Sequence, residues 1–442
     1  MRFFDRLRSP ALVVAGLCLL AFGLRVLRLD FHPIWFDEDL AYQRAIVALD
    51  ISLASMAGSP LYYILLRGWV ELAGASLFAL RYFSALLGAL VIPLTYQVVR
   101  RLLGGRLARA VTVVAVLAPF YIYYSQEART YSLTLVLMLV SMYAFLRWLD
   151  TRTGWALAVC CLANLICLYT HFVAVLVMVT QGVMLLLTSN VRWKDTIVFS
   201  IAQAGVGLAF LPWLLLVENA LPRVFAPPDS TTLDAWSVLA RTWTEFSVGR
   251  TIPPPLSLYL AMLPLFLALA GLLSVVSDRK TEVRSQRSEI KSRRSVVSRR
   301  SCAMILLVWL IVPIVGSLLA PRASVRFSPK YLIAVTPVYY TLIVLGLAAL
   351  RKESRKLFWV CLVALACIGL YALGDYYLWQ HDKLARIQDQ PIAQVAVSLA
   401  EDSSTHLRGC EWENHAHLEQ YEYGEGVFSF LALYCSIPSR MT

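Results

Sequence analysis

The sequence predicts an all-α polytopic membrane protein. Of its 442 residues, 59% are hydrophobic and only 15% are charged. The apolar residues are gathered into long runs, many of which are long enough for a helix to cross a hydrocarbon core of about 30 Å. Most charged residues fall between these runs. The pattern therefore favours a bundle of membrane-spanning helices over a soluble domain.

Eleven apolar runs are predicted to span the membrane. The first follows a short basic start, as in a signal peptide, but no small-x-small cleavage site comes after it, so we interpret it as a retained anchor. Several of the other runs are shorter than the usual span of about 20 residues. The predicted spans are residues 11–29, 82–99, 108–124, 131–146, 155–170, 172–188, 196–217, 256–276, 302–320, 331–350 and 357–374.

The positive charge of the chain is explained by membrane orientation. The net charge is +12, which in a soluble protein would suggest nucleic acid as a partner. With the N-terminus inside, however, the inner segments hold more than half of the 40 Lys and Arg residues but only a quarter of the 28 Asp and Glu residues. This is the positive-inside pattern. It predicts a cytoplasmic-membrane protein with an inner N-terminus and an outer C-terminal tail, surrounded by membrane lipids and without a nucleic-acid partner.

The predicted organisation is one transmembrane domain, residues 1–375, followed by an outer tail, residues 376–442. Residues 30–81 form the first outer loop of the domain. Residues 278–301 are rich in Ser and Arg and poor in apolar residues, so we interpret them as a basic cytoplasmic linker near lipid head groups.

The first outer loop contains a further apolar segment, residues 60–72. It includes Arg67, Trp69 and Glu71, which suit a helix lying at the membrane interface better than a span. We expect this helix to lie over the part of the loop that contains Asp37.

Three consecutive acids, Asp37, Glu38 and Asp39, follow the first span and the aromatic pair Trp35-Phe36. Carboxylates so close to lipid are costly and suggest a functional role. Asp37 is the predicted general base, because packing against the two aromatic rings would raise its proton affinity. The alternative is that the acids only begin a helix and interact with its dipole.

A second charged motif contains Glu127 and Arg129 and is flanked on both sides by tyrosines. On the predicted topology it opens on the same side of the membrane as Asp37. A guanidinium can bind two phosphate oxygens and aromatic faces stack on sugar rings, so the motif suits a sugar phosphate. The alternative is an ordinary polar turn with an internal Glu-Arg pair.

Two further outer segments carry candidate binding residues. His171 interrupts an apolar stretch and either contacts substrate or marks a loop. Arg322, Arg326 and Lys330 crowd a short loop before Tyr331, against the positive-inside trend. A lipid phosphate is the partner that best explains them, and stray interfacial charges are the alternative.

The motifs that contain these residues resemble the GT-C type polytopic glycosyltransferases. The resemblance is greatest to the bacterial group related to dolichyl-phosphate-mannose protein mannosyltransferases and to the aminoarabinose transferase of lipid A. It extends over roughly residues 10–350. The segments that carry it are LRVLRLDFHPIWFDE, PLYYILLRGW, FALRYFSALLGALVIPLTYQVVRRLLGGR, PFYIYYSQEARTYSL, YTHF and SPKYLIAVTP.

This resemblance implies an enzyme that moves one sugar, with inversion, from a polyprenyl-phosphate donor to a lipid, polysaccharide or protein acceptor on the outer membrane face. It implies neither a metal nor another cofactor. By position, Asp37 matches the catalytic acid and Glu38 its partner, and Glu127 is the acid of the second motif. The positions that match substrate-binding motifs are Arg129, His171, Lys330 and Tyr331, with Lys330 in place of a common arginine.

A transporter or flippase of lipid-linked sugars is the alternative function. Such a protein would use the same charges to bind its cargo without making a bond. It predicts charged or helix-breaking residues at mid-membrane depth and an internal repeat. In this sequence the candidate charges gather at one predicted surface, and no repeat of convincing period is present.

Overall fold

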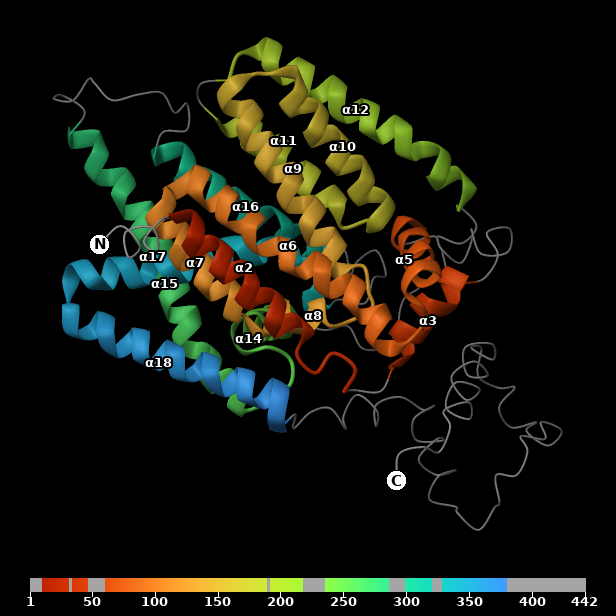
Figure 1. The fold of residues 1–442 in the computed structure, drawn as a ribbon. Coiled ribbons are helices and arrows are strands. Elements are labelled where there is room, and N and C mark those ends of the chain that lie inside the picture. Colours follow the sequence, from red (N-terminus) through yellow and green to blue (C-terminus); the bar gives the residue numbers. More distant parts are fainter. Residues whose placement is uncertain are drawn as a thin grey trace.

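The computed structural model describes residues 10–31, 34–46, 60–188, 191–217, 235–285, 299–319 and 328–379, and this part of the chain is helical (Figure 1). The helices are α2 (Pro10–Val26), α3 (Phe36–Ile46), α5 (Pro60–Ala73), α6 (Leu77–Leu103), α7 (Gly105–Leu117), α8 (Pro119–Ser125), α9 (Tyr131–Thr151), α10 (Gly154–Thr170), α11 (Ala174–Leu187), α12 (Trp193–Leu216), α14 (Ala235–Val248), α15 (Leu256–Ser285), α16 (Arg299–Leu319), η2 (Pro329–Val335), α17 (Thr336–Glu353), α18 (Arg355–Gly374) and η3 (Asp375–Trp379).

Each predicted span corresponds to a helix or to a bent pair of helices. Within the described residues, six helices are long and apolar enough to cross a membrane, and the bent pair α7–α8 would be a seventh. Four other apolar helices, α2, α10, α11 and α16, are shorter. The all-α multi-pass character is therefore confirmed, while eleven crossings remain a prediction.

Some predicted boundaries differ from the structure. The predicted interfacial segment is the helix α5, whose 14 residues are too few for a span. Helix α15 continues to Ser285, so the predicted linker begins as helix, and residues 286–298 lie outside the described part. Helical structure also continues to Trp379, four residues beyond the predicted end of the transmembrane domain at residue 375. The rest of the tail lies outside the described residues.

The bend between α7 and α8 was not predicted from the sequence, which suggested one continuous span. The two helices meet at an angle of 57°. Ala118, between them, is extended, as expected for a residue that precedes a proline, and Pro119 begins α8. The bend brings the turn of residues 126–130 to the start of α3, where the charged residues meet.

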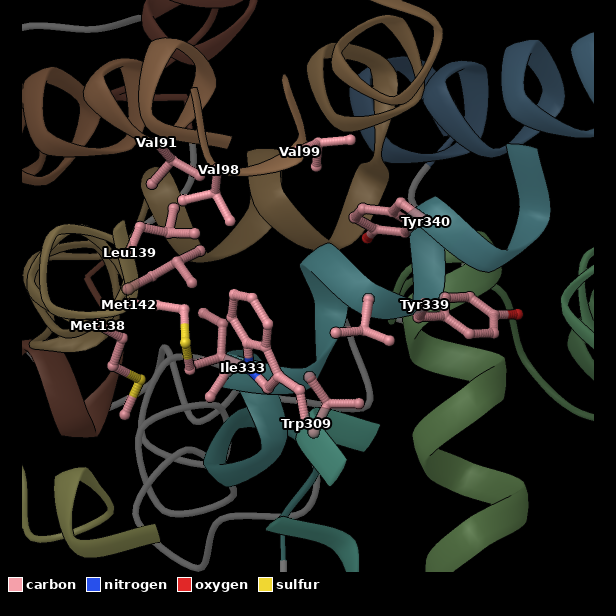
Figure 2. Close-up of a cluster of buried hydrophobic side chains, with 14 of the residues drawn as sticks. Val91, Val98, Val99, Met138, Leu139, Met142, Trp309, Ile333, Tyr339 and Tyr340 are labelled. Atoms are coloured by element: carbon pink, nitrogen blue, oxygen red, sulfur yellow. The ribbon is translucent and has the colours of Figure 1, made fainter. Parts of the chain in front are cut away.

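The hydrophobic core lies between α6, α9, α16, η2 and α17. Most of α9 and α17 is buried, whereas α12 and α18 lie along opposite edges of the bundle in Figure 1 and expose most of their length. Figure 2 shows the centre of this core, where methionine, aromatic and branched side chains interdigitate. Labelled core residues include Val91, Val98, Met138, Met142, Trp309, Ile333 and Tyr340.

Helices α15 and α17 cross at two glycines. A Cβ at Gly271 would lie 2.0 Å from the carbonyl oxygen of Leu342, and one at Gly346 would lie 2.0 Å from that of Leu267. Backbone atoms occupy both positions and cannot rotate away. Close contact of the two helices therefore depends on the absence of side chains, as is common between membrane helices.

Gly346→Ala is expected to lower stability by about 1–3 kcal/mol, because the added methyl group must push the two helices apart. The measurement is the thermal unfolding midpoint of the purified protein in detergent. Gly369→Ala is the matched control, because a Cβ at Gly369 on α18 meets no atom within 4 Å. A Gly346→Ala protein as stable as the control would contradict the proposed packing constraint.

Candidate active site

The acidic cluster lies in the first turn of α3. The amides of Glu38 and Asp39 donate to the carbonyl of Trp35, at 2.9 and 3.0 Å, and so begin the helix. All three acids are in this first turn, where the helix dipole favours negative charge. The acids therefore do begin a helix and interact with its dipole, as the alternative expected. Asp37 and Glu38 nevertheless have long-range charged partners, which this alternative alone does not require.

Asp37 faces two cations from distant segments. Its Oδ2 lies 3.4 Å from Nη2 of Arg129 and 3.6 Å from Nζ of Lys330. Arg129 also donates through Nη1 to the backbone carbonyl of Asp37, at 2.9 Å. The Asp37 side chain remains 25% exposed, so a ligand can reach it. The structure therefore brings together one predicted acid and two predicted binding residues.

The predicted rise in the proton affinity of Asp37 is wrong. Burial by itself raises the pKa of Asp37, but the charges of Arg129 and Lys330 outweigh burial and hold the pKa below its usual value. The aromatic rings are neighbours of Asp37 in the sequence, whereas both cations come from distant segments. Asp37 is consequently ionised at neutral pH.

Glu38 has a different environment from its neighbour. Arg81 on α6 binds it with two hydrogen bonds, Nε to Oε1 at 2.9 Å and Nη2 to Oε2 at 2.6 Å. The amide of Ala128 donates to the same Oε1 at 2.9 Å, and Arg81 also donates to the carbonyl of Leu29 at 3.0 Å. Both charged side chains are buried. Glu38 thus joins α3 to α6 and to the 126–130 turn.

Arg81 was not assigned a role from the sequence. It is the last residue of the predicted first outer loop, directly before the span predicted for residues 82–99, so the positive-inside rule leaves it unexplained, as it does Lys330. An arginine on the predicted outer side was therefore a signal that Arg81 has a specific role. Its partner could not be identified from the sequence, because Glu38 is 43 residues away.

Glu127 lies in the turn between α8 and α9 and is buried. Burial, and then the negative charge of Glu38, raise the pKa of Glu127 to about 8, against the opposing effects of Lys330, Arg250 and Arg129. A carboxyl group with this pKa is mostly protonated at pH 7. Glu127 therefore differs from Asp37 in charge although both are acids of one site.

Glu245 and Arg250 were also missed. Arg250, just after α14, lies near Tyr124 and Glu127, and its guanidinium carbon is 6.0 Å from the ring centre of Tyr123. The Glu245 carboxylate is buried and pairs with Arg241 at 3.1 Å. Burial raises the pKa of Glu245. Their outer loop was recognised in the sequence, but nothing in it indicated that α14 would pack against α8.

His171 ends α10 and packs among aromatic rings. The amide of Val173 donates to its Nδ1 at 3.3 Å, and the ring centres of Tyr331 and Tyr131 lie 5.6 and 6.3 Å from that of His171. Burial and then the charges of Lys330 and Arg129 lower the pKa of His171 to about 3. His171 is therefore neutral. Its predicted contact with substrate stays a prediction.

The tyrosines contact the cations of the site. The Lys330 ammonium lies 5.2 Å from the ring centre of Tyr131 and 5.9 Å from that of Tyr331, both distances suited to cation–π attraction.

Arg322 and Arg326 lie outside the described residues, and their predicted role stays a prediction. Within the described ranges, no three His, Cys, Asp or Glu residues are grouped as a metal would require.

Comparisons with known proteins agree with this architecture. The sequence model of the dolichyl-phosphate-mannose-protein mannosyltransferase family matches residues 57–216, less than half of the chain. No protein with curated annotation matches the sequence significantly.

Solved structures match over more of the chain. ArnT from Cupriavidus metallidurans in the apo state has a TM-score of 0.56 and 16% identity, covering 88% of this chain and 72% of ArnT. The same protein bound to undecaprenyl phosphate has a TM-score of 0.53, 15% identity and the same coverage. An oligosaccharyltransferase from Archaeoglobus fulgidus in complex with Zn and sulfate has a TM-score of 0.52 and 14% identity, covering 83% of this chain and 53% of its own.

These likenesses define the class of fold. The chain is a multi-pass membrane protein with the GT-C glycosyltransferase fold, as its motifs predicted. It resembles ArnT over most of both chains and spans about half of the archaeal oligosaccharyltransferase. At these identities the comparison establishes the fold, and the reaction must be argued from the site.

Glu38→Gln is expected to lower stability by about 3–5 kcal/mol, because it leaves the Arg81 guanidinium buried without a counter-charge. The unfolding midpoint in detergent measures this loss. Glu71→Gln is the control, since Glu71 forms an exposed pair with Arg67 and its loss should cost at most about 1 kcal/mol. Equal midpoints for the two variants would show that Glu38 does not hold the site together.

Glu127→Gln is expected to gain stability relative to the wild type as the pH rises. The folded protein retains the Glu127 proton up to a pKa of about 8, whereas the ordinary value is 4.5. Between these two pH values, folding of the wild type takes up a proton at Glu127. Its free energy of unfolding therefore falls by about 1.4 kcal/mol per pH unit because of this group. Glutamine does not titrate, so the variant lacks this pH dependence. The test compares unfolding midpoints of both proteins from pH 5.5 to 8. A constant difference would mean that the Glu127 pKa is not raised.

Proposed function

We propose that this protein is an inverting glycosyltransferase that moves a sugar from a polyprenyl-phosphate donor to an acceptor hydroxyl on the outer face of a cytoplasmic membrane. The observation that carries the proposal is the ionised Asp37 carboxylate beside Arg129 and Lys330. This arrangement combines a proton acceptor with two phosphate-binding cations. The GT-C fold supports it, because the similar ArnT structure was solved with undecaprenyl phosphate.

In the proposed reaction the acceptor oxygen attacks the anomeric carbon from the face opposite the phosphate. The new carbon–oxygen bond forms as the bond between the anomeric carbon and the phosphate oxygen breaks. The bonding electrons leave with polyprenyl phosphate, and the acceptor proton passes to Asp37. Attack from the opposite face inverts the anomeric configuration.

The charges of the site suit each part of this step. Arg129 and Lys330 stabilise the negative charge that develops on the departing phosphate, so no proton donor is needed for the leaving group. Asp37 accepts the proton as the attacking hydroxyl becomes acidic. A donor phosphate that binds the two cations also reduces their hold on Asp37, which increases the proton affinity of the base.

A protonated Glu127 has a role that an ionised acid cannot fill. It donates a hydrogen bond to a phosphate or sugar oxygen without adding negative charge next to an anionic donor. Glu38 and Arg81 are positioning residues, because their polar atoms bind one another and the neighbouring backbone.

The transporter alternative receives less support. Asp37, Glu127 and Arg129 lie in loops or at a helix start, where a reaction at the membrane surface needs them.

The proposal also includes the topology and the acceptor. We propose that the N-terminus lies inside and that residues 380–442 lie outside. Lipid, polysaccharide and protein hydroxyls are all suitable acceptors for the chemistry.

Asp37→Asn is expected to lower kcat by about 10²–10⁴, the usual contribution of a general base, with little change in KM. The assay is release of undecaprenyl phosphate from undecaprenyl-phosphate-linked mannose, glucose and aminoarabinose by purified protein supplied with a cell-envelope extract. Asp39→Asn is the control, because Asp39 lies in the same helical turn and its hydrogen bond comes from Gln43. Wild-type turnover by Asp37→Asn, or no release from any donor by the wild type, would refute the proposal.

A further inference from the structure

The segment after the last span folds back against the end of the first. In η3, which follows α18, Tyr376 and Tyr377 are buried. Tyr377 donates its hydroxyl to the carbonyl of Leu24, near the end of α2, and Arg28 donates to the carbonyl of Tyr377. The two ends of the helical domain are therefore joined beside the candidate site. None of these residues belongs to the reacting groups described above.

Gln126 connects this junction to the site. Its amide nitrogen donates to the carbonyls of Arg25 and Leu27, both at 2.9 Å, and so satisfies carbonyls at the end of α2 that lack helical partners. Its amide oxygen accepts a hydrogen bond from the hydroxyl of Tyr376. Both ends of the Gln126 amide are thus engaged, which determines the orientation of the side chain.

Gln126 is also the first residue of the turn that holds Glu127 and Arg129. Its backbone amide donates to the carbonyls of Ile122 and Tyr123 at 3.1 Å, which attaches the turn to the end of α8. The tyrosines reinforce this attachment, because the rings of Tyr376 and Tyr123 pack edge to face with centres 6.1 Å apart. The turn is consequently held from three sides, by α8, α2 and η3.

We propose that Tyr376 is a positioning residue for the reaction: through Gln126 it holds the turn so that Glu127 and Arg129 face the donor. The proposal rests on the proposed transferase function. It makes the site dependent on docking of the last span, because the Tyr376 hydroxyl and the Gln126 amide are 250 residues apart in sequence. A hydroxyl that binds a buried amide oxygen cannot be replaced by a ring alone, since the oxygen then loses its partner.

The environment of Glu127 provides a readout that general destabilisation does not move. The charged or titratable groups that face Glu127 are Glu38 from α3, Arg81 from α6, Tyr124 from α8, Arg129 from its own turn, Arg250 after α14, Lys330 from η2 and Tyr376 from η3. If the turn loosens, water reaches the carboxyl group. The pKa of Glu127 then falls from about 8 toward its ordinary value.

The experiment compares full-length Tyr376→Phe with the wild type and with Tyr259→Phe, a change at a residue of α15 that is 72% exposed. In Tyr376→Phe we expect amide hydrogen exchange in residues 126–130 to become at least about fivefold faster. We also expect kcat to fall about tenfold while KM stays within about twofold. The alkaline limb of the kcat profile should move to lower pH by at least about 0.5 unit. Tyr259→Phe should match the wild type in each measurement.

A second variant tests the connection itself. Gln126→Leu removes the acceptor, so adding Tyr376→Phe to it should accelerate exchange in residues 126–130 no further. Additive effects would overturn the proposal, as would wild-type exchange and an unmoved alkaline limb in Tyr376→Phe. If the wild-type protein transfers no sugar, the proposed function fails, while the exchange measurements still decide whether Tyr376 holds the turn.

Discussion

The candidate site depends on the buried pair of Glu38 and Arg81. Helix α3 belongs to an outer loop, and this pair attaches its first turn to α6 and, through the Ala128 amide, to the 126–130 turn. The guanidinium binds the carboxylate with two parallel hydrogen bonds. This geometry best offsets the free-energy cost of removing both charges from water. Because Asp37 precedes Glu38, the same attachment places Asp37 against Arg129 and Lys330.

Glu38 also contributes to the different charges of Glu127 and Asp37. Burial, and then the negative charge of Glu38, disfavour the ionised form of Glu127, whereas Arg129 and Lys330 outweigh burial and favour the ionised form of Asp37. Two carboxyl groups of similar intrinsic acidity are thereby separated into an ionised and a protonated one, a pattern typical of catalytic sites. The separation arises from position alone, since neither acid has an unusual covalent neighbour.

The sequence was most informative where the signal is local. Long apolar runs located the helices, and the strings around Asp37 and Glu127 located the acids and the GT-C resemblance. Partners from distant segments could not be read in this way: Arg81, Arg250 and Tyr376 meet the site only after the helices pack. The pKa of Asp37 was predicted with the wrong sign for the same reason, because its cations come from the 126–130 turn and η2. The bend at Pro119 had a local signal, the proline itself, but the apolar run on both sides of it suggested a straight span.

The proposed chemistry requires a base that changes during the reaction cycle. In the free site, Arg129 and Lys330 hold Asp37 ionised but make it a poor proton acceptor. A donor phosphate competes with Asp37 for these cations and brings its own negative charge, so both effects raise the proton affinity of the carboxylate when the acceptor is to be deprotonated. The protonated Glu127 is then a necessary complement, because a second ionised acid would oppose binding of the anion that activates the first. In this scheme, binding of the donor itself raises the proton affinity of the catalytic base, Asp37. The 126–130 turn must then keep Glu127 and Arg129 in place, so that the donor phosphate contacts both side chains.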